Sequence, residues 1–158
     1  MSDEAAFLAA LKANPVDDTA RLVYADWLDE NGEPVRAEYL RFVVTTARNE
    51  GNLAAATGAE RFVGFGVALA EEWRTKVGSR FDLLLTRFWD GDAIQTTRFI
   101  RELTGCSFGE ARAIIDNLAF RNISQPLLSR ISFEAASQVC ERVRRWDYFA
   151  LSIAPSRP

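Results

Sequence analysis

The 158-residue chain contains no histidine, and that absence removes much of familiar enzyme chemistry. Without an imidazole there is no Ser-His-Asp or Cys-His pair, and no side chain whose ordinary pKa suits a general base near neutral pH. The two cysteines, Cys106 and Cys140, are too few for a disulfide framework and have no histidine to join them in a zinc site. We therefore expect a protein without catalytic activity, cofactor or metal ion.

Long apolar runs and a targeting segment are also missing. The apolar runs fall far short of the ~20 residues that cross a bilayer. Residues 1–4 lack the basic start of a secretion signal. With 48% apolar and 26% charged residues, the composition is that of a globular chain. We expect a cytoplasmic protein with no membrane partner.

Charge is distributed unevenly along the chain. Residues 1–78 contain 13 acidic and 8 basic residues, a net charge of −5, whereas residues 79–158 contain 9 acidic and 11 basic residues, a net charge of +2. Both lysines precede this boundary, and every later cation is an arginine. The change in composition predicts two domains, residues 1–78 and residues 79–158.

Apolar residues recur every three or four positions throughout the first half, which predicts an all-helical module. Its helix boundaries are marked by Ser2, by Asp17 or Asp18, by Asn31-Gly32 and by Pro34. A last helix is expected to begin at Leu53 or Ala59 and to end at Gly78.

The second half changes period. Alternating residues from Phe81 to Thr86 predict a strand, and Ile123–Leu128 and Phe149–Ile153 predict two more, with Pro126 confining its strand to a sheet edge. Between them lie a helix ended by Gly105, a helix opened by the capping box Ser107–Glu110, and a helix capped by Ser132. The expected fold class is α+β: the helical module is followed by a small β-α-α-β-α-β domain.

One stretch of the first half carries a family resemblance. Its residues are Ala6-Phe7-Leu8, Asn14-Pro15, Asp17-Asp18-Thr19, Arg21-Leu22-Val23-Tyr24-Ala25-Asp26-Trp27-Leu28-Asp29-Glu30, Gly32, Pro34 and Arg36-Ala37-Glu38-Tyr39-Leu40-Arg41. This pattern closely resembles the bacterial repeat-companion domain over about residues 4–78. In that family the domain usually precedes other modules, often leucine-rich-type repeats, so the resemblance implies a partner-binding or positioning role.

Within this motif, Asp26 and Trp27 are candidate partner-binding residues. The alternative is structural: charged residues of the motif pair between neighbouring helices while Trp27 covers the seam. The sequence leaves both interpretations open.

The second half carries another resemblance. Its residues are Phe81-Asp82-Leu83-Leu84-Leu85-Thr86, Arg98-Phe99-Ile100-Arg101, Thr104-Gly105, Phe108, Glu110-Ala111-Arg112 and Ile114-Ile115. They resemble the C-terminal domain of the large-subunit ribosomal stalk protein, in which a helical hairpin presents basic residues to acidic faces of translation factors. Arg98, Arg101 and Arg112 match basic positions of that hairpin. Gly109 and Asp92 depart from it, standing where the family often has basic residues.

The N-degron adaptor of the Clp protease shares the fold of the stalk domain. That family has Asn-Asp-Asp after its first strand and a histidine in its pocket. Here the corresponding stretch is Thr86–Asp90 and the chain has no histidine. We expect no recognition of peptide N-termini.

The sequence thus predicts a non-enzymatic adaptor that binds an acidic protein surface through Arg98, Arg101 and Arg112. The alternative is a nucleic-acid-binding regulatory protein, but a net charge of +2 in the second half and a pI of about 5.1 are a weak footprint for it. A third class, an enzyme based on carboxylates, requires acidic side chains that converge in a pocket. The partner, the oligomeric state and the biological process are left open.

Overall fold

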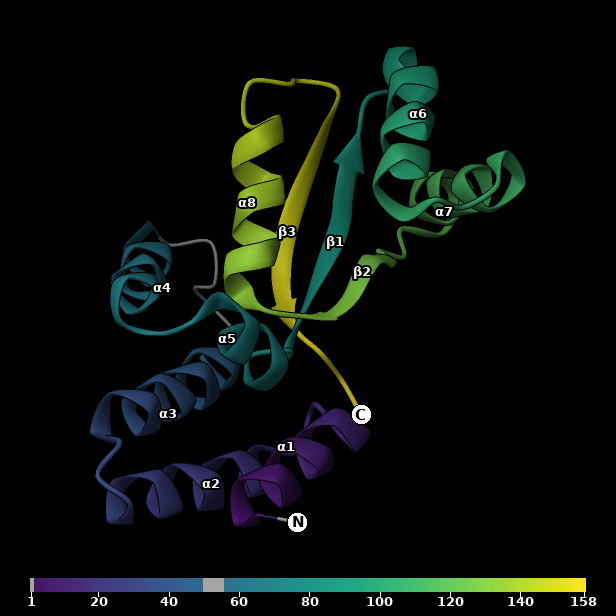
Figure 1. The fold of residues 1–158 in the computed structure, drawn as a ribbon. Coiled ribbons are helices and arrows are strands. Elements are labelled where there is room, and N and C mark those ends of the chain that lie inside the picture. Colours follow the sequence, from purple (N-terminus) through teal and green to yellow (C-terminus); the bar gives the residue numbers. More distant parts are fainter. Residues whose placement is uncertain (1, 50–55) are drawn as a thin grey trace.

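The computed structural model of the protein describes residues 2–49 and 56–158, and over these ranges the fold is mixed α+β. The described ranges hold eight α-helices and a three-stranded antiparallel sheet (Figure 1). In chain order the elements are α1 (Asp3–Ala13), α2 (Asp18–Glu30), α3 (Pro34–Arg48), α4 (Ala56–Ala68), α5 (Glu71–Val77), β1 (Phe81–Phe88), the short 3-10 helix η1 (Asp90–Asp92), α6 (Ala93–Thr104), α7 (Phe108–Arg121), β2 (Pro126–Ile131), α8 (Phe133–Val143) and β3 (Phe149–Pro155).

Four predicted helix starts, those of α1, α2, α7 and α8, are confirmed by capping contacts. The side chains of Ser2, Asp17 and Ser132 each accept a hydrogen bond from a backbone N–H in the first turn of α1, α2 and α8. Asp17 rather than Asp18 is the cap of α2, which leaves the Asp18 carboxylate available for other partners.

The expected single helix up to Gly78 is wrong, because the chain forms two helices, α4 and α5. The backbone is extended at Ala70, just before α5 begins. The Leu69 carbonyl beside the break accepts a hydrogen bond from Arg74 Nε at 3.1 Å, so a side chain replaces a helical donor. The proposed start at Leu53 lies outside the described residues.

The sheet has the order β2-β1-β3 with antiparallel neighbours. The expected strand at 123–128 is displaced, since β2 spans Pro126–Ile131. Asn122 adopts a left-handed conformation and the Ile123 N–H bonds to the Asn117 carbonyl, so these residues still belong to the end of α7. β2 is an edge strand that begins at its proline, as a ring without an N–H requires.

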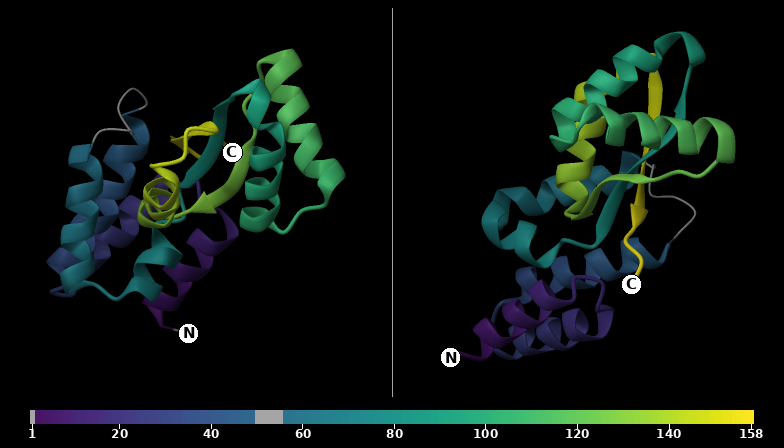
Figure 2. Two further views of the ribbon diagram at one scale, coloured as in Figure 1. Left: turned by 90° about the horizontal axis from the view of Figure 1, so that it is seen from above. Right: turned by 90° about the vertical axis from the view of Figure 1, so that its right-hand side faces the viewer.

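Helices α6, α7 and α8 lie along the sheet, while α1, α2 and α3 sit beyond one end of it (Figures 1 and 2). Helix α4 packs against α8, so the two halves of the chain meet along more than the connecting segment. No helix of the described ranges has both the length and the apolar character to cross a membrane.

Two apolar clusters hold the fold together, and the first crosses the expected domain boundary. It joins buried residues of α1–α5 to Phe81 of β1 and Phe133 of α8. Val77 and Phe81 are fully buried in it and Trp73 packs against it, so these residues form an apolar seam at the joint, the connection between the two halves around residues 78–80. The second cluster lies between α6, α7, α8 and the sheet.

Candidate functional site

The α6–α7 hairpin has a turn that the local sequence fixes. Gly105 ends α6 in the left-handed conformation, with φ at 71°. Ser107 and Glu110 form a capping box at the start of α7: the Ser107 side chain accepts from the Glu110 N–H, and the Glu110 carboxylate accepts from the Ser107 N–H. Since Phe99 and Ile115 are buried in the second cluster, the hairpin is anchored by its inner side.

Arg98 and Arg101 lie on the outer side of α6, and both are exposed. Neither makes an ion pair with any side chain of the described ranges. Arg112 is different, because its Nε lies 3.0 Å from Asp116 Oδ1 one turn along α7. Within the described ranges, two of the three predicted arginines therefore have no ion-pair partner, and the third has an exposed pair within its own helix.

Large apolar side chains are also exposed on the hairpin helices. Ile94 of α6 is 77% exposed and Phe108 of α7 is 61% exposed. Ile94, Arg98 and Arg101 are spaced by four and three residues, which places them along one stripe of α6. The outer side of α6 therefore combines exposed apolar surface with guanidinium groups that have no ion pair in the described part of the chain.

Asp26 and Trp27 make contacts that hold the helical half together. Arg41 of α3 donates to Asp26 Oδ1 at 2.7 Å and to Asp29 Oδ2 at 2.6 Å, so one guanidinium ties α3 to two carboxylates of α2. Trp27 is half-buried, with its ring 5.8 Å from Phe7 of α1. These contacts account for both residues without a partner, and their role in binding stays a prediction.

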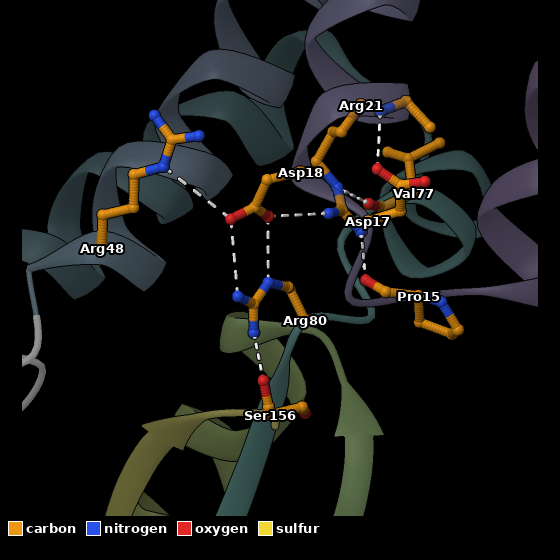
Figure 3. Close-up of polar contacts among 9 residues, drawn as sticks. Pro15, Asp17, Asp18, Arg21, Arg48, Val77, Arg80 and Ser156 are labelled. Atoms are coloured by element: carbon orange, nitrogen blue, oxygen red, sulfur yellow. Dashed lines mark hydrogen bonds and ion pairs between the residues drawn. The ribbon is translucent and has the colours of Figure 1, made fainter. Parts of the chain in front are cut away.

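A polar network at the joint was not foreseen from the sequence (Figure 3). Asp18 of α2 accepts from Arg80 Nε at 3.0 Å and from Arg21 Nη1 at 3.3 Å, and Arg48 Nε lies 3.9 Å away. Arg80 precedes β1 and also donates to the Ser156 carbonyl that follows β3. Through Arg80, one carboxylate of the helical half is linked to the start of the central strand β1 and to the end of the edge strand β3.

Arg21 is a fully buried member of the same network. Its Nε donates to the Val77 carbonyl at 2.9 Å and its Nη2 donates to the Pro15 carbonyl at 2.8 Å. Burial lowers the pKa of Arg21 to about 10, against the opposing effect of Asp18. The guanidinium remains charged at neutral pH. Its hydrogen bonds connect the start of α2 to the end of α5.

A second network links α8 to the helical half. Glu134 Oε1 accepts from Arg74 Nη1 at 2.7 Å and from the Tyr39 hydroxyl at 2.9 Å. The two ion-pair partners are 12% and 13% exposed, so water screens them little. Burial, followed by the nearby Glu134 charge, raises the pKa of Tyr39. The tyrosine therefore stays a hydrogen-bond donor.

Buried polar atoms and possible metal ligands of the described part of the chain are accounted for as follows. Each of its buried side-chain nitrogen and oxygen atoms has a hydrogen-bond partner. No group of three or more carboxylate or thiol residues there is placed to hold a metal ion. The charged residues at the joint hold neighbouring elements together, whereas Arg98 and Arg101 belong to the exposed cations that make no ion pair within the described ranges.

Comparison of the chain with protein-family models, with curated protein sequences and with solved structures gave no match. The relationships to the repeat-companion and stalk domains accordingly stay predictions from the residues quoted above.

Proposed function

We propose that this protein is a non-enzymatic adaptor that binds an acidic protein surface through the outer side of the α6–α7 hairpin. The observation that carries the proposal is the pair Arg98 and Arg101, exposed on one helix and without an ion pair among the described side chains. Charges that lack an internal partner are available to steer and orient an oppositely charged protein.

Apolar surface beside the arginines supports a protein partner. Interfaces obtain most of their affinity from a few buried aromatic, aliphatic and arginine side chains, while rim charges set orientation and association rate. Ile94 and Phe108 supply exposed apolar area on the two hairpin helices. A purely electrostatic site for nucleic acid would need neither of them.

Rigidity of the hairpin supports the same role. The turn is capped at both helix ends, and the inner sides of α6 and α7 are packed into the second apolar cluster. A partner therefore meets side chains whose backbone is already ordered, which lowers the entropic cost of binding. The stalk-like resemblance, which places basic residues at these positions, points to the same surface.

The test is quantitative capture of partners from an extract of the source cells. The bait variants are Arg98→Glu/Arg101→Glu and a control, Arg142→Glu/Arg145→Glu, whose exposed arginines lie at the end of α8 and just beyond it. Both variants change the net charge equally. We expect partners held by the wild type and the control to be lost from the hairpin variant.

Two results would overturn the proposal. Identical partner lists for the wild type and the hairpin variant would show that the arginines of α6 are not the binding surface. Equal losses from the hairpin and control variants would show that net charge, rather than this surface, governs capture. A steep dependence of duplex binding on salt would instead favour the nucleic-acid alternative.

A further inference from the structure

A groove of about 570 Å³ opens where α1, α5 and β2 meet, away from the hairpin. Leu8, Leu11 and Pro15 form its apolar floor, since Leu11 is buried and the other two are half-buried. Lys12, Lys76 and Arg130 line the same groove and are exposed. The groove thus has an aliphatic base and a cationic rim.

The two lysines of the chain both lie in this groove. They come from different helices, α1 and α5, which pack against one another. Lys76 Nζ lies 2.7 Å from Glu72 Oε1, but the two side chains are 57% and 81% exposed, so the pair holds the ammonium only weakly. Lys12 has no ion pair with a side chain of the described ranges.

Arg130 reaches the groove from an irregular point of β2. Its backbone has φ at 55°, a conformation that arginine seldom adopts, and the pairing of β2 with β1 shifts register beside it. Asp82 Oδ1 accepts the Arg130 N–H at 3.0 Å and also accepts from Ser156 Oγ at 2.5 Å. A carboxylate that is itself held in place thereby keeps the Arg130 backbone at the groove.

The lining selects the chemistry of an occupant. Ammonium and guanidinium groups at the rim pair with carboxylates, and the floor accepts an aliphatic side chain between them. Nucleic acid fits less well, because the floor offers no aromatic ring for a base and the surrounding residues 1–78 have a net charge of −5. The cationic rim stands out in that acidic half of the chain.

We infer that this groove binds an acidic, leucine-bearing peptide segment of a partner protein. Carboxylates of the segment pair with Lys12, Lys76 and Arg130, and its aliphatic side chain packs on Leu8, Leu11 and Pro15. The site is independent of the arginine hairpin and belongs to the joint, since its lining comes from both halves of the chain.

The test uses a fluorescent peptide of alternating aspartate and leucine, blocked at both ends, titrated with the full chain by anisotropy. A peptide with asparagine in place of aspartate is the ligand control. We expect the acidic peptide to bind, and Lys12→Glu/Lys76→Glu to weaken its binding about tenfold or more, as the loss of complementary charge requires. Arg130→Asn, which suits the left-handed backbone, should weaken it as well.

Matched variants separate this site from the hairpin. Arg142→Glu/Arg145→Glu makes the same change of net charge and should bind like the wild type, as should Arg98→Glu/Arg101→Glu. Amine acylation read by mass spectrometry gives a second measurement, because bound acidic peptide should protect Lys12 and Lys76 and the asparagine peptide should not.

The inference is overturned if the acidic peptide does not bind the wild type, or if Lys12→Glu/Lys76→Glu binds it unchanged. Equal binding of the acidic and asparagine peptides would also overturn it. Tighter binding of an oligonucleotide, lost in the same lysine variant, would assign the groove to nucleic acid instead.

Discussion

Gly78 shows at the residue scale how tightly the chain packs at the end of α5, beside the joint. A Cβ atom there would lie 2.7 Å from the Arg74 carbonyl oxygen and 2.7 Å from the Tyr39 hydroxyl. The φ of Gly78 is −92°, which any residue adopts, so the position needs glycine for space and not for conformation. The Tyr39 side chain cannot easily move away from an added Cβ atom, because its hydroxyl donates a hydrogen bond to Glu134 of α8.

Gly78→Ala should therefore lower the free energy of unfolding by about 1–3 kcal/mol, the usual cost of overpacking. Gly64→Ala is the control, since Gly64 lies inside α4 and an added Cβ meets no atom within 4 Å. It should raise the free energy of unfolding by about 0.5–1 kcal/mol through helix propensity. Urea unfolding of both variants measures the difference, and equal effects would contradict the close approach at Gly78.

At the scale of single elements, one carboxylate fastens α1 to the rest of the helical half. Glu4 Oε1 accepts from the Tyr24 hydroxyl of α2 at 2.8 Å and from Arg36 Nη2 of α3. The same Arg36 guanidinium lies 4.5 Å from the ring centroid of Trp73 in α5. The hydrogen bond from Arg36, followed by that from Tyr24, lowers the pKa of Glu4 from its ordinary value of 4.5.

This lowered pKa predicts how stability depends on pH. A carboxyl whose folded pKa is depressed stabilises the fold fully above its unfolded pKa, near 4.5, and the stabilisation is lost as the pH falls through the folded pKa. The difference in free energy of unfolding between wild type and Glu4→Gln should be largest near neutrality and shrink below about pH 4.5. In an Arg36→Leu background, Glu4→Gln should lose most of its effect. Urea unfolding at several pH values measures both effects. If the difference in free energy of unfolding between wild type and Glu4→Gln stays constant with pH, the Glu4 carboxylate does not stabilise the fold through these contacts.

Local signals in the sequence located many element boundaries but not the interruptions that depend on tertiary contacts. Ser2, Ser107 and Ser132 cap the helices they were expected to cap, because a cap involves residues three positions apart. The break before α5 involves Arg74, which donates to Leu69 and also pairs with Glu134, 60 residues later. The sequence pattern contains no signal for that pair.

The candidate sites also differ in whether local sequence signals or tertiary contacts reveal them. The exposure of Arg98 and Arg101 follows from the apolar spacing of α6, so a helical reading of the sequence finds both. The groove depends on bringing Lys12, Lys76 and Arg130 together from three elements. Asp18 and Arg80, which meet at the joint, are 62 residues apart, and no local pattern of the sequence connects them.

At the scale of the whole molecule, the two halves share one core. The Phe133 ring of α8 stacks on Phe62 of α4 with centroids 4.7 Å apart and meets the edge of Phe81 at 5.3 Å. Phe133 is 2% exposed, so a residue placed in the second half by sequence is buried in the core of the first. The ion pairs Arg80–Asp18 and Arg74–Glu134 also connect the two halves. These contacts predict that the halves unfold together.

Phe133→Ala removes the ring from this shared core and should lower the free energy of unfolding by about 3–5 kcal/mol. Trp73→Ala removes a side chain that the helical half contributes to the same cluster, and it should likewise destabilise both halves. The measurement is hydrogen exchange at amides of α2 and of β1, compared with an exposed-site control, Ile94→Ala, whose effect should stay within about 0.5 kcal/mol. Because the cluster contains residues of both halves, each core variant should accelerate exchange in α2 and in β1 by the same factor, with one thermal transition. Two transitions, or faster exchange confined to the half that carries the substitution, would show that the seam does not couple them.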